Sequence, residues 1–161
     1  QRTVYVSALS KSVASGLRVG FIAAPLRWMP EFERAIRVST WTAPSLSISL
    51  ACRWIDDGVV DMLEDEKRKD ARRRQTLARR VLRDLDVIAH PASYFTWVAL
   101  PDDVRAEQVA ARLLSQGVIV PTAEPFATAA PVPQALRVVV SSLPPDVLRG
   151  ALEKIRLAAL G

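Results

Sequence analysis

Ser7-Ala-Leu-Ser-Lys-Ser-Val-Ala-Ser-Gly-Leu-Arg-Val-Gly20 is the stretch on which the interpretation of this chain depends. Residues 3–6 before it are β-branched or aromatic, which is typical of a strand. Residues 19–24 form a second apolar run, and glycines punctuate the segment between the two runs. The pattern predicts a strand, a turn that carries Lys11, and a second strand.

The turn combines groups that suit one kind of ligand. We expect Lys11 to be desolvated at the junction of strand and turn, and desolvation favours the neutral amine that attacks aldehydes. The planar guanidinium of Arg18 can bind a phosphate through two hydrogen bonds, and the hydroxyls of Ser7 and Ser10 can add further contacts. This set would hold a phosphate-bearing aldehyde such as pyridoxal phosphate (PLP). The alternative is an ordinary strand–turn–strand with surface cations.

The spacing within the stretch resembles the Ser-Lys…Gly-x-Arg-x-Gly signature of the class I/II aminotransferases, the fold-type I PLP family. The matching residues are Ser10, Lys11, Gly16, Arg18 and Gly20. The resemblance implies that Lys11 forms the covalent bond to the cofactor and that Arg18 binds its phosphate. Ala8 departs from the pattern, because the family usually carries Ser or Thr there as a phosphate ligand. Ser7 or Ser10 would have to compensate.

Composition excludes several other classes of protein. The 161 residues are half apolar and 24% charged, as in ordinary globular proteins, and the net charge of +5 favours anionic partners without identifying one. Cys52 is the only cysteine and His90 the only histidine, which excludes an internal disulfide and a metal site built from several histidines. Without a membrane-length apolar run or a signal peptide, the chain is expected to be cytoplasmic.

The start of the chain indicates a longer protein. Gln1 leads directly into a strand without an initiator methionine. We therefore expect a C-terminal fragment that lacks most of the large domain of the family fold.

Two helices are predicted after the second strand. Residues 31–38 have apolar positions at helical spacing, and residues 45–58 have a second apolar stripe that ends at a glycine. The segment from Trp41 to Pro44 and the turn from Trp54 to Gly58 are similar to the hinge between the large and small domains of the family. Within the family they most resemble the aminotransferase-like half of the MocR-type members of the GntR transcriptional regulators.

A long helix is predicted over residues 59–85. Residues 64–76 contain four acids and six bases, and we expect this segment to be solvated, with only the second half of the helix packed on a core. The basic run from Arg72 to Arg83 has no interleaved aromatic residue for base stacking. A solvated helix explains it better than a nucleic-acid interface, so DNA binding would belong to a missing N-terminal domain.

The rest of the chain alternates between strands and helices and resembles the small C-terminal domain of the family. The predicted strands cover residues 87–90, 94–100, 118–120 and 135–140, and the predicted helices cover 102–116 and 146–160. The fold class is therefore α/β, with an α+β small domain. We expect three segments: residues 1–25 end the PLP-binding large domain, 26–85 form the hinge and interdomain helices, and 86–161 form the small domain.

Arg137 is the second candidate site residue. Its neighbours in the predicted strand are apolar, and an unpaired buried charge is costly, so its guanidinium needs a partner such as a carboxylate. The resemblance implies that it binds the α-carboxylate of an amino acid. The alternative is an edge-strand arginine that reaches solvent.

Three functions remain open. The first is the PLP-binding effector domain of a MocR/GntR-type transcriptional regulator, which recognises an amino-acid-like small molecule, binds DNA only through a missing N-terminal domain and forms a homodimer when full length. The second is an aminotransferase that acts on an amino acid and a 2-oxo acid. The third is a relic without cofactor function. We expect the isolated fragment to be inactive, because the acid and the aromatic ring that complete a PLP site come from upstream sequence. No membrane or metal is implied.

Overall fold

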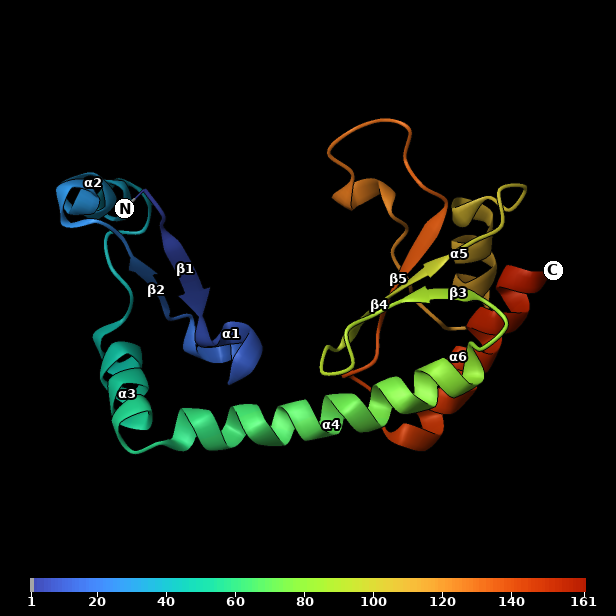
Figure 1. The fold of residues 1–161 in the computed structure, drawn as a ribbon, viewed down its shortest axis with the longest axis horizontal. Coiled ribbons are helices and arrows are strands. Elements are labelled where there is room, and N and C mark those ends of the chain that lie inside the picture. The colour runs from blue at the N-terminus through green and yellow to red at the C-terminus, as the bar shows by residue number, and fades with distance from the viewer. Residues whose placement is uncertain (1) are drawn as a thin grey trace. The chain divides into compact units, whose positions relative to one another are not determined.

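The computed structural model describes residues 2–161 as a mixture of helices and strands (Figure 1). The chain divides into two compact units, one ending at Lys67 and the other covering Arg68–Gly161, and each is described by itself. The boundary falls within the long helix α4 (Val59–Val81). The α/β class is as predicted, whereas the division into segments 1–25, 26–85 and 86–161 stays a prediction.

The first unit begins with the predicted strand–turn–strand. Strands β1 (Tyr5–Ala8) and β2 (Gly20–Ala23) pair antiparallel, with Ser7 opposite Phe21. The connection between them holds a single helical turn, α1 (Leu9–Ser12), and a 3-10 turn, η1 (Ser15–Leu17). The elements that follow are η2 (Leu26–Trp28), α2 (Met29–Ser39) and α3 (Ser45–Asp56). The two helices predicted in this region are confirmed.

A small apolar core holds the hairpin connection. Its buried members are Leu9, Val13, Leu17, Val19 and Ala51. Leu9 and Val13 are four residues apart, so they project from the same side of the turn. Side chains from α3 and from the first turns of α4 pack against this cluster, including Val60 and Leu63. Apolar side chains therefore hold this connection from one side.

The second unit is an antiparallel sheet with helices on one face (Figure 1). The strand order is β3 (Asp86–Ile88), β4 (Phe95–Ala99), β5 (Ala135–Val139). Helices α5 (Ala106–Ser115) and α6 (Pro145–Leu160) and the second half of α4 contribute to one core with the sheet. Alternation along the strands buries Val98, Leu136 and Val138 against the helices and leaves the intervening residues on the other face half-buried.

The predicted strand at residues 118–120 is wrong. This segment is irregular, and only one bridge follows it, between Thr122 and Leu136. Pro121 accepts a hydrogen bond from the Arg137 amide at 2.9 Å but has no N–H to donate, so a regular ladder cannot continue along β5. Val118 and Val120 pack against the core without strand pairing, and Ile119 between them is exposed.

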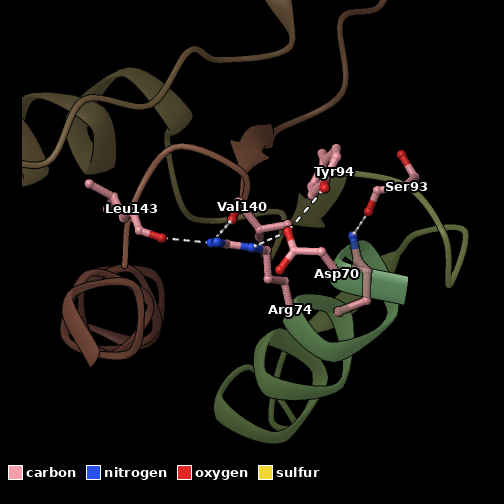
Figure 2. A network of polar contacts seen from close by, with 7 residues as sticks. Asp70, Arg74, Ser93, Tyr94, Val140 and Leu143 are labelled. Atoms are coloured by element: carbon pink, nitrogen blue, oxygen red, sulfur yellow. Dashed lines mark hydrogen bonds and ion pairs between the residues drawn. The ribbon is translucent and has the colours of Figure 1, made fainter. Parts of the chain in front are cut away.

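The charged half of α4 is not a uniformly solvated surface, which corrects the sequence-based expectation. Arg74 donates to a carboxylate oxygen of Asp70 at 2.7 Å and to the carbonyl oxygens of Val140 and Leu143 at 2.9 and 2.6 Å (Figure 2). The Tyr94 hydroxyl donates to the same Asp70 oxygen at 3.0 Å. We name these five residues the Arg74 network. It ties α4 to the residue that precedes β4 and to the segment after β5.

A buried amide adds a second polar link between α4 and the sheet. Gln75 is 1% exposed and donates to the backbone oxygen of Ser93 at 2.8 Å and to the hydroxyl of Thr96 at 2.9 Å. Thr96 faces the helices from β4 and is fully buried, so each polar side chain satisfies the other. These contacts explain why a strongly charged helix can pack on a sheet.

The pH dependence of stability should report on Tyr94. Burial, together with the hydrogen bond to Asp70 and its charge, raises the pKa of Tyr94 above its ordinary value of 10.0. The unfolded chain therefore loses this proton at a lower pH than the native chain, and the stability that depends on it declines as the pH rises above about 10. We expect Tyr94→Phe to cost about 1 kcal/mol at neutral pH and to make the alkaline decline shallower.

Urea unfolding of the chain, followed by circular dichroism at about pH 7 and about pH 11, measures both effects. Tyr5→Phe is the matched control, because Tyr5 is 62% exposed and is the only other tyrosine. An equally steep alkaline decline in Tyr94→Phe and in the unmodified chain would contradict the assignment.

Candidate functional site

Backbone hydrogen bonds close the Lys11 turn, which is the connection between β1 and β2. The amides of Val13 and Ala14 both donate to the carbonyl of Leu9, at 2.8 and 2.9 Å, and the Leu9 amide donates to the carbonyl of Val19 at 3.1 Å. These bonds close the turn on itself and join it to the residue that precedes β2. Lys11 lies in the middle of this closed segment.

Lys11 is exposed, so the prediction that it is desolvated is wrong for the chain described here. The reason is the local geometry of α1. Leu9 and Val13 face the small core, and Lys11, two residues after Leu9, falls near the opposite side of a helical turn. The sequence predicted correctly that Lys11 lies in the turn after the first strand, but it predicted a buried amine where the structure has an exposed one.

Lys11 differs from the other lysines in its contacts. The chain has four lysines. Lys67 donates to the carbonyl of Val13 at 2.6 Å, Lys154 donates to the carbonyl of Gln116 at 2.9 Å, and Lys69 also has an interaction partner. Within residues 2–161, Lys11 has no hydrogen-bond or ion-pair partner. Its amine is therefore available for an external reactant.

The other predicted phosphate ligands occupy the same hairpin connection. Ser7 lies near the end of β1, just before α1, and is half-buried, as is Ser10. Arg18 is exposed and adopts the left-handed conformation at φ 53°, which is uncommon for a residue with a side chain. Gly20 permits the close approach of the strands, because a Cβ there would lie 3.0 Å from the Ser7 carbonyl oxygen.

The donor set of this connection fits a phosphate-bearing aldehyde. In the part of the chain that the structure describes, Ser7, Ser10, Lys11 and Arg18 form no side-chain hydrogen bonds or ion pairs with one another. A primary amine suits an aldehyde, and a guanidinium with two hydroxyls suits a phosphate. Ala8 supplies no such group, so the hydroxyls that remain are those on either side of it.

Arg137 lies in the second unit, on the half-buried face of β5. Its guanidinium carbon is 4.2 Å from the centre of the Phe95 ring and 4.9 Å from that of Phe126, which are cation–π contacts. No carboxylate among residues 2–161 forms an ion pair with it. The predicted partner of the Arg137 guanidinium is therefore a pair of aromatic rings, which pack against it. The hydrogen-bonding edge of the guanidinium meets no carboxylate of the described chain.

Three aromatic residues around Arg137 were not assigned to a site from the sequence. Register places Trp97 directly opposite Arg137, and Phe126 from η3 (Glu124–Phe126) meets the Trp97 ring edge-on at 5.8 Å. Alternation along β4 could have placed Phe95 and Trp97 on one face, because they are two residues apart. Nothing in the loop sequence indicates the position of Phe126.

A cleft of about 640 Å³ borders Arg137 within the second unit. It is lined mainly by apolar residues from the irregular segment 117–121, from β5 and from α6. This volume is within the range of small-molecule sites. The residues described contain no group of three or more side chains of the kind that ligate metals, and no helix among them is both long and apolar enough to cross a membrane.

Comparison with protein families gives one clear match. The model described as "Aminotransferase class I and II" matches residues 1–155, which is nearly the whole chain. The match includes both the Lys11 turn and Arg137.

Two curated relatives from Bacillus subtilis (strain 168) are similar to this chain. The uncharacterized HTH-type transcriptional regulator YdeF is 30% identical over 129 residues, covering 78% of this chain and 27% of the relative. The uncharacterized HTH-type transcriptional regulator YdfD is 26% identical over 125 residues, covering 73% of this chain and 25% of the relative. The chain thus spans about a quarter of the length of these relatives.

Solved structures of aminotransferases share the fold. The kynurenine aminotransferase of Pyrococcus horikoshii, solved with PMP, has a TM-score of 0.89 at 20% identity, covering 98% of this chain and 40% of that one. LysN, the alpha-aminoadipate aminotransferase of Thermus thermophilus, solved with N-(5'-phosphopyridoxyl)-L-leucine, has a TM-score of 0.85 at 19% identity, covering 98% of this chain and 42% of that one.

Proposed function

The chain belongs to the aminotransferase class I and II family, and from that premise we propose that it is part of the PLP-binding effector domain of a transcriptional regulator. The observation that carries the proposal is the Lys11 turn, where an amine, a guanidinium and two hydroxyls are left without partners in the described chain. The names of the two curated relatives support the regulator assignment over a free-standing enzyme.

Each residue of the turn has a proposed role. Lys11 supplies the amine that bonds covalently to the cofactor aldehyde, and Arg18 binds the phosphate with Ser7 and Ser10. When bound, PLP supplies an electron-withdrawing ring that makes the α-carbon bonds of an amino acid labile. The amine of Lys11 would also accept and return a proton in this proposal.

Arg137 has a separate proposed role, which is to bind the carboxylate of an amino-acid-like effector. The rings of Phe95 and Phe126 hold the guanidinium by its faces, and its edge keeps the planar pair of donors that matches a carboxylate. Because the side chain is already ordered by the rings, less conformational entropy is lost when the effector binds.

The remaining parts of the proposal concern the whole protein. DNA binding would belong to an N-terminal domain outside this chain, as the HTH names of the relatives suggest, and the full-length protein would act as a homodimer in the cytoplasm. The 161-residue chain alone would not catalyse transamination.

The test measures effector response in the full-length protein loaded with PLP. We expect one class of amino acid to change both the visible absorbance of the bound cofactor and the affinity for DNA fragments that the protein selects from genomic DNA, the latter by about fivefold or more. Arg137→Met should abolish the response to the amino acid but not the binding of PLP. Arg112→Met, which removes an exposed cation from α5, should leave both unchanged.

The outcomes separate the candidate functions. Sustained production of a 2-oxo acid over many turnovers, with no effect on DNA affinity, would identify an aminotransferase instead. Failure of the wild-type protein to retain PLP would identify a relic. An unchanged amino-acid response in Arg137→Met would contradict the role of that arginine.

A further inference from the structure

A long-range hydrogen bond in the first unit joins α4 to the Lys11 turn. Lys67 donates to the carbonyl oxygen of Val13 at 2.6 Å, across 54 positions of sequence, and the contact is partly buried. Val13 is the C-cap residue of α1 and is itself buried. Lys67 is thus hydrogen-bonded to the backbone two residues after Lys11.

The contact belongs to one face of α4. Val60, Leu63 and Lys67 follow each other at spacings of three and four, so they lie along one side of the helix. Val60 and Leu63 pack against the buried cluster that contains Leu9 and Val13. The same face of α4 therefore gives the turn two apolar contacts and one charge-assisted hydrogen bond.

The turn needs support of this kind. A helical segment of four residues is not stable by itself, and the last carbonyl groups of any helix lack partners within it. Lys67 satisfies one of those carbonyls with a positively charged donor, which is the favourable charge at a helix C-terminus. Without the Lys67 hydrogen bond, the apolar contacts of Leu9 and Val13 would have a larger share in fixing the orientation of the exposed Lys11.

We propose that Lys67 is a positioning residue for Lys11: it fixes the end of the α1 turn so that the amine of Lys11 points consistently toward the cofactor aldehyde. The inference rests on the proposed PLP function only in what the positioned amine reacts with. Lys67 acts on Lys11 through the backbone of Val13 and not through contact with the cofactor.

The experiment compares covalent and noncovalent binding in the full-length protein. We expect Lys67→Met, which keeps most of the apolar stem, to slow borohydride-trapped attachment of PLP to Lys11 about tenfold, the scale of one hydrogen bond to a charged group. Binding of pyridoxamine phosphate, which lacks the aldehyde, should change by less than about threefold, because that binding does not use the lysine amine. Lys67→Arg retains a charged donor and should restore most of the rate.

Amide hydrogen exchange without cofactor gives an independent readout. Lys67→Met should raise the exchange of the Val13 and Ala14 amides about tenfold, since the turn they close opens more often. Arg72→Met, a control on the exposed side of α4, should change neither exchange nor trapping. Unchanged exchange in Lys67→Met, or equal losses of PLP and pyridoxamine phosphate binding, would overturn the positioning role. Absence of PLP attachment in the wild type, with exchange altered as expected, would overturn the proposed function instead.

Discussion

Replacing Lys11 by alanine is expected to abolish covalent attachment of PLP to the full-length protein, measured as the cofactor retained after borohydride reduction. The amine is the group that bonds to the aldehyde, and no other side chain of this connection can replace it. Peptide mapping by mass spectrometry should locate the reduced adduct on the Lys11 peptide in the wild type and find none there in the variant. Replacing Lys11 should therefore remove the covalent adduct entirely, whereas replacing a proposed phosphate ligand such as Arg18 should only weaken the binding of PLP.

Two controls make this result specific. Lys11→Arg keeps the positive charge but removes the nucleophilic amine, so it should also lose the adduct, which separates chemistry from electrostatics. Lys154→Ala removes a lysine whose amine donates a hydrogen bond to the backbone carbonyl of Gln116, and this variant should retain the adduct. An adduct that persists in Lys11→Ala, mapped to Lys67 or Lys69, would contradict the assignment of the reactive amine.

The sequence predicted the elements around Lys11 because each depends on local pattern. Two apolar runs separated by glycines specify a hairpin, and the structure has strands at Tyr5–Ala8 and Gly20–Ala23. Local pattern does not say which side of a short turn meets the core. The exposure of Lys11 was therefore wrongly predicted, since it depends on where Ala51 and Leu63 pack, and those residues lie far along the chain.

The sheet of the second unit was also largely predicted. Apolar runs between helical patterns indicated β3, β4 and β5, whereas their order in the sheet comes from the structure. The segment Val118–Val120 has the composition of a strand. It does not pair, because Pro121 beside it has no N–H to donate to a ladder. Composition cannot separate a strand from an irregular segment that packs on the same core.

Polar burial was the part least accessible from sequence. Charged residues on α4 were expected in solvent because no apolar stripe accompanies them. Gln75 and Arg74 are nevertheless buried or nearly so, because their partners include backbone carbonyls of the segment before β4 and of the segment after β5. A carbonyl has no signature in the sequence, so only the folded arrangement shows that these side chains are satisfied.

The Arg74 network leads to the second large effect. We expect Arg74→Met to destabilise the second unit by about 2–4 kcal/mol, because the change removes three hydrogen bonds and leaves two carbonyl oxygens and the Asp70 carboxylate without this donor (Figure 2). The arginine side chain is 15% exposed, so water cannot fully replace it. The loss should appear as faster amide hydrogen exchange at Leu136 and Val138, which report on the strand beside the network.

The network also makes a claim about coupling that single variants cannot test. Asp70→Asn keeps the size of the side chain but removes its charge, and Asp70 remains 36% exposed, so it should cost less than Arg74→Met. The double variant should cost less than the sum of the two, since removing both partners leaves no unpaired charge between them. Arg73→Met, an exposed neighbour on the same helix, should lie within about 0.5 kcal/mol of the wild type. Additive losses for Asp70 and Arg74 would mean that the arginine acts through the carbonyls of Val140 and Leu143 alone, and that its ion pair contributes nothing to the second unit.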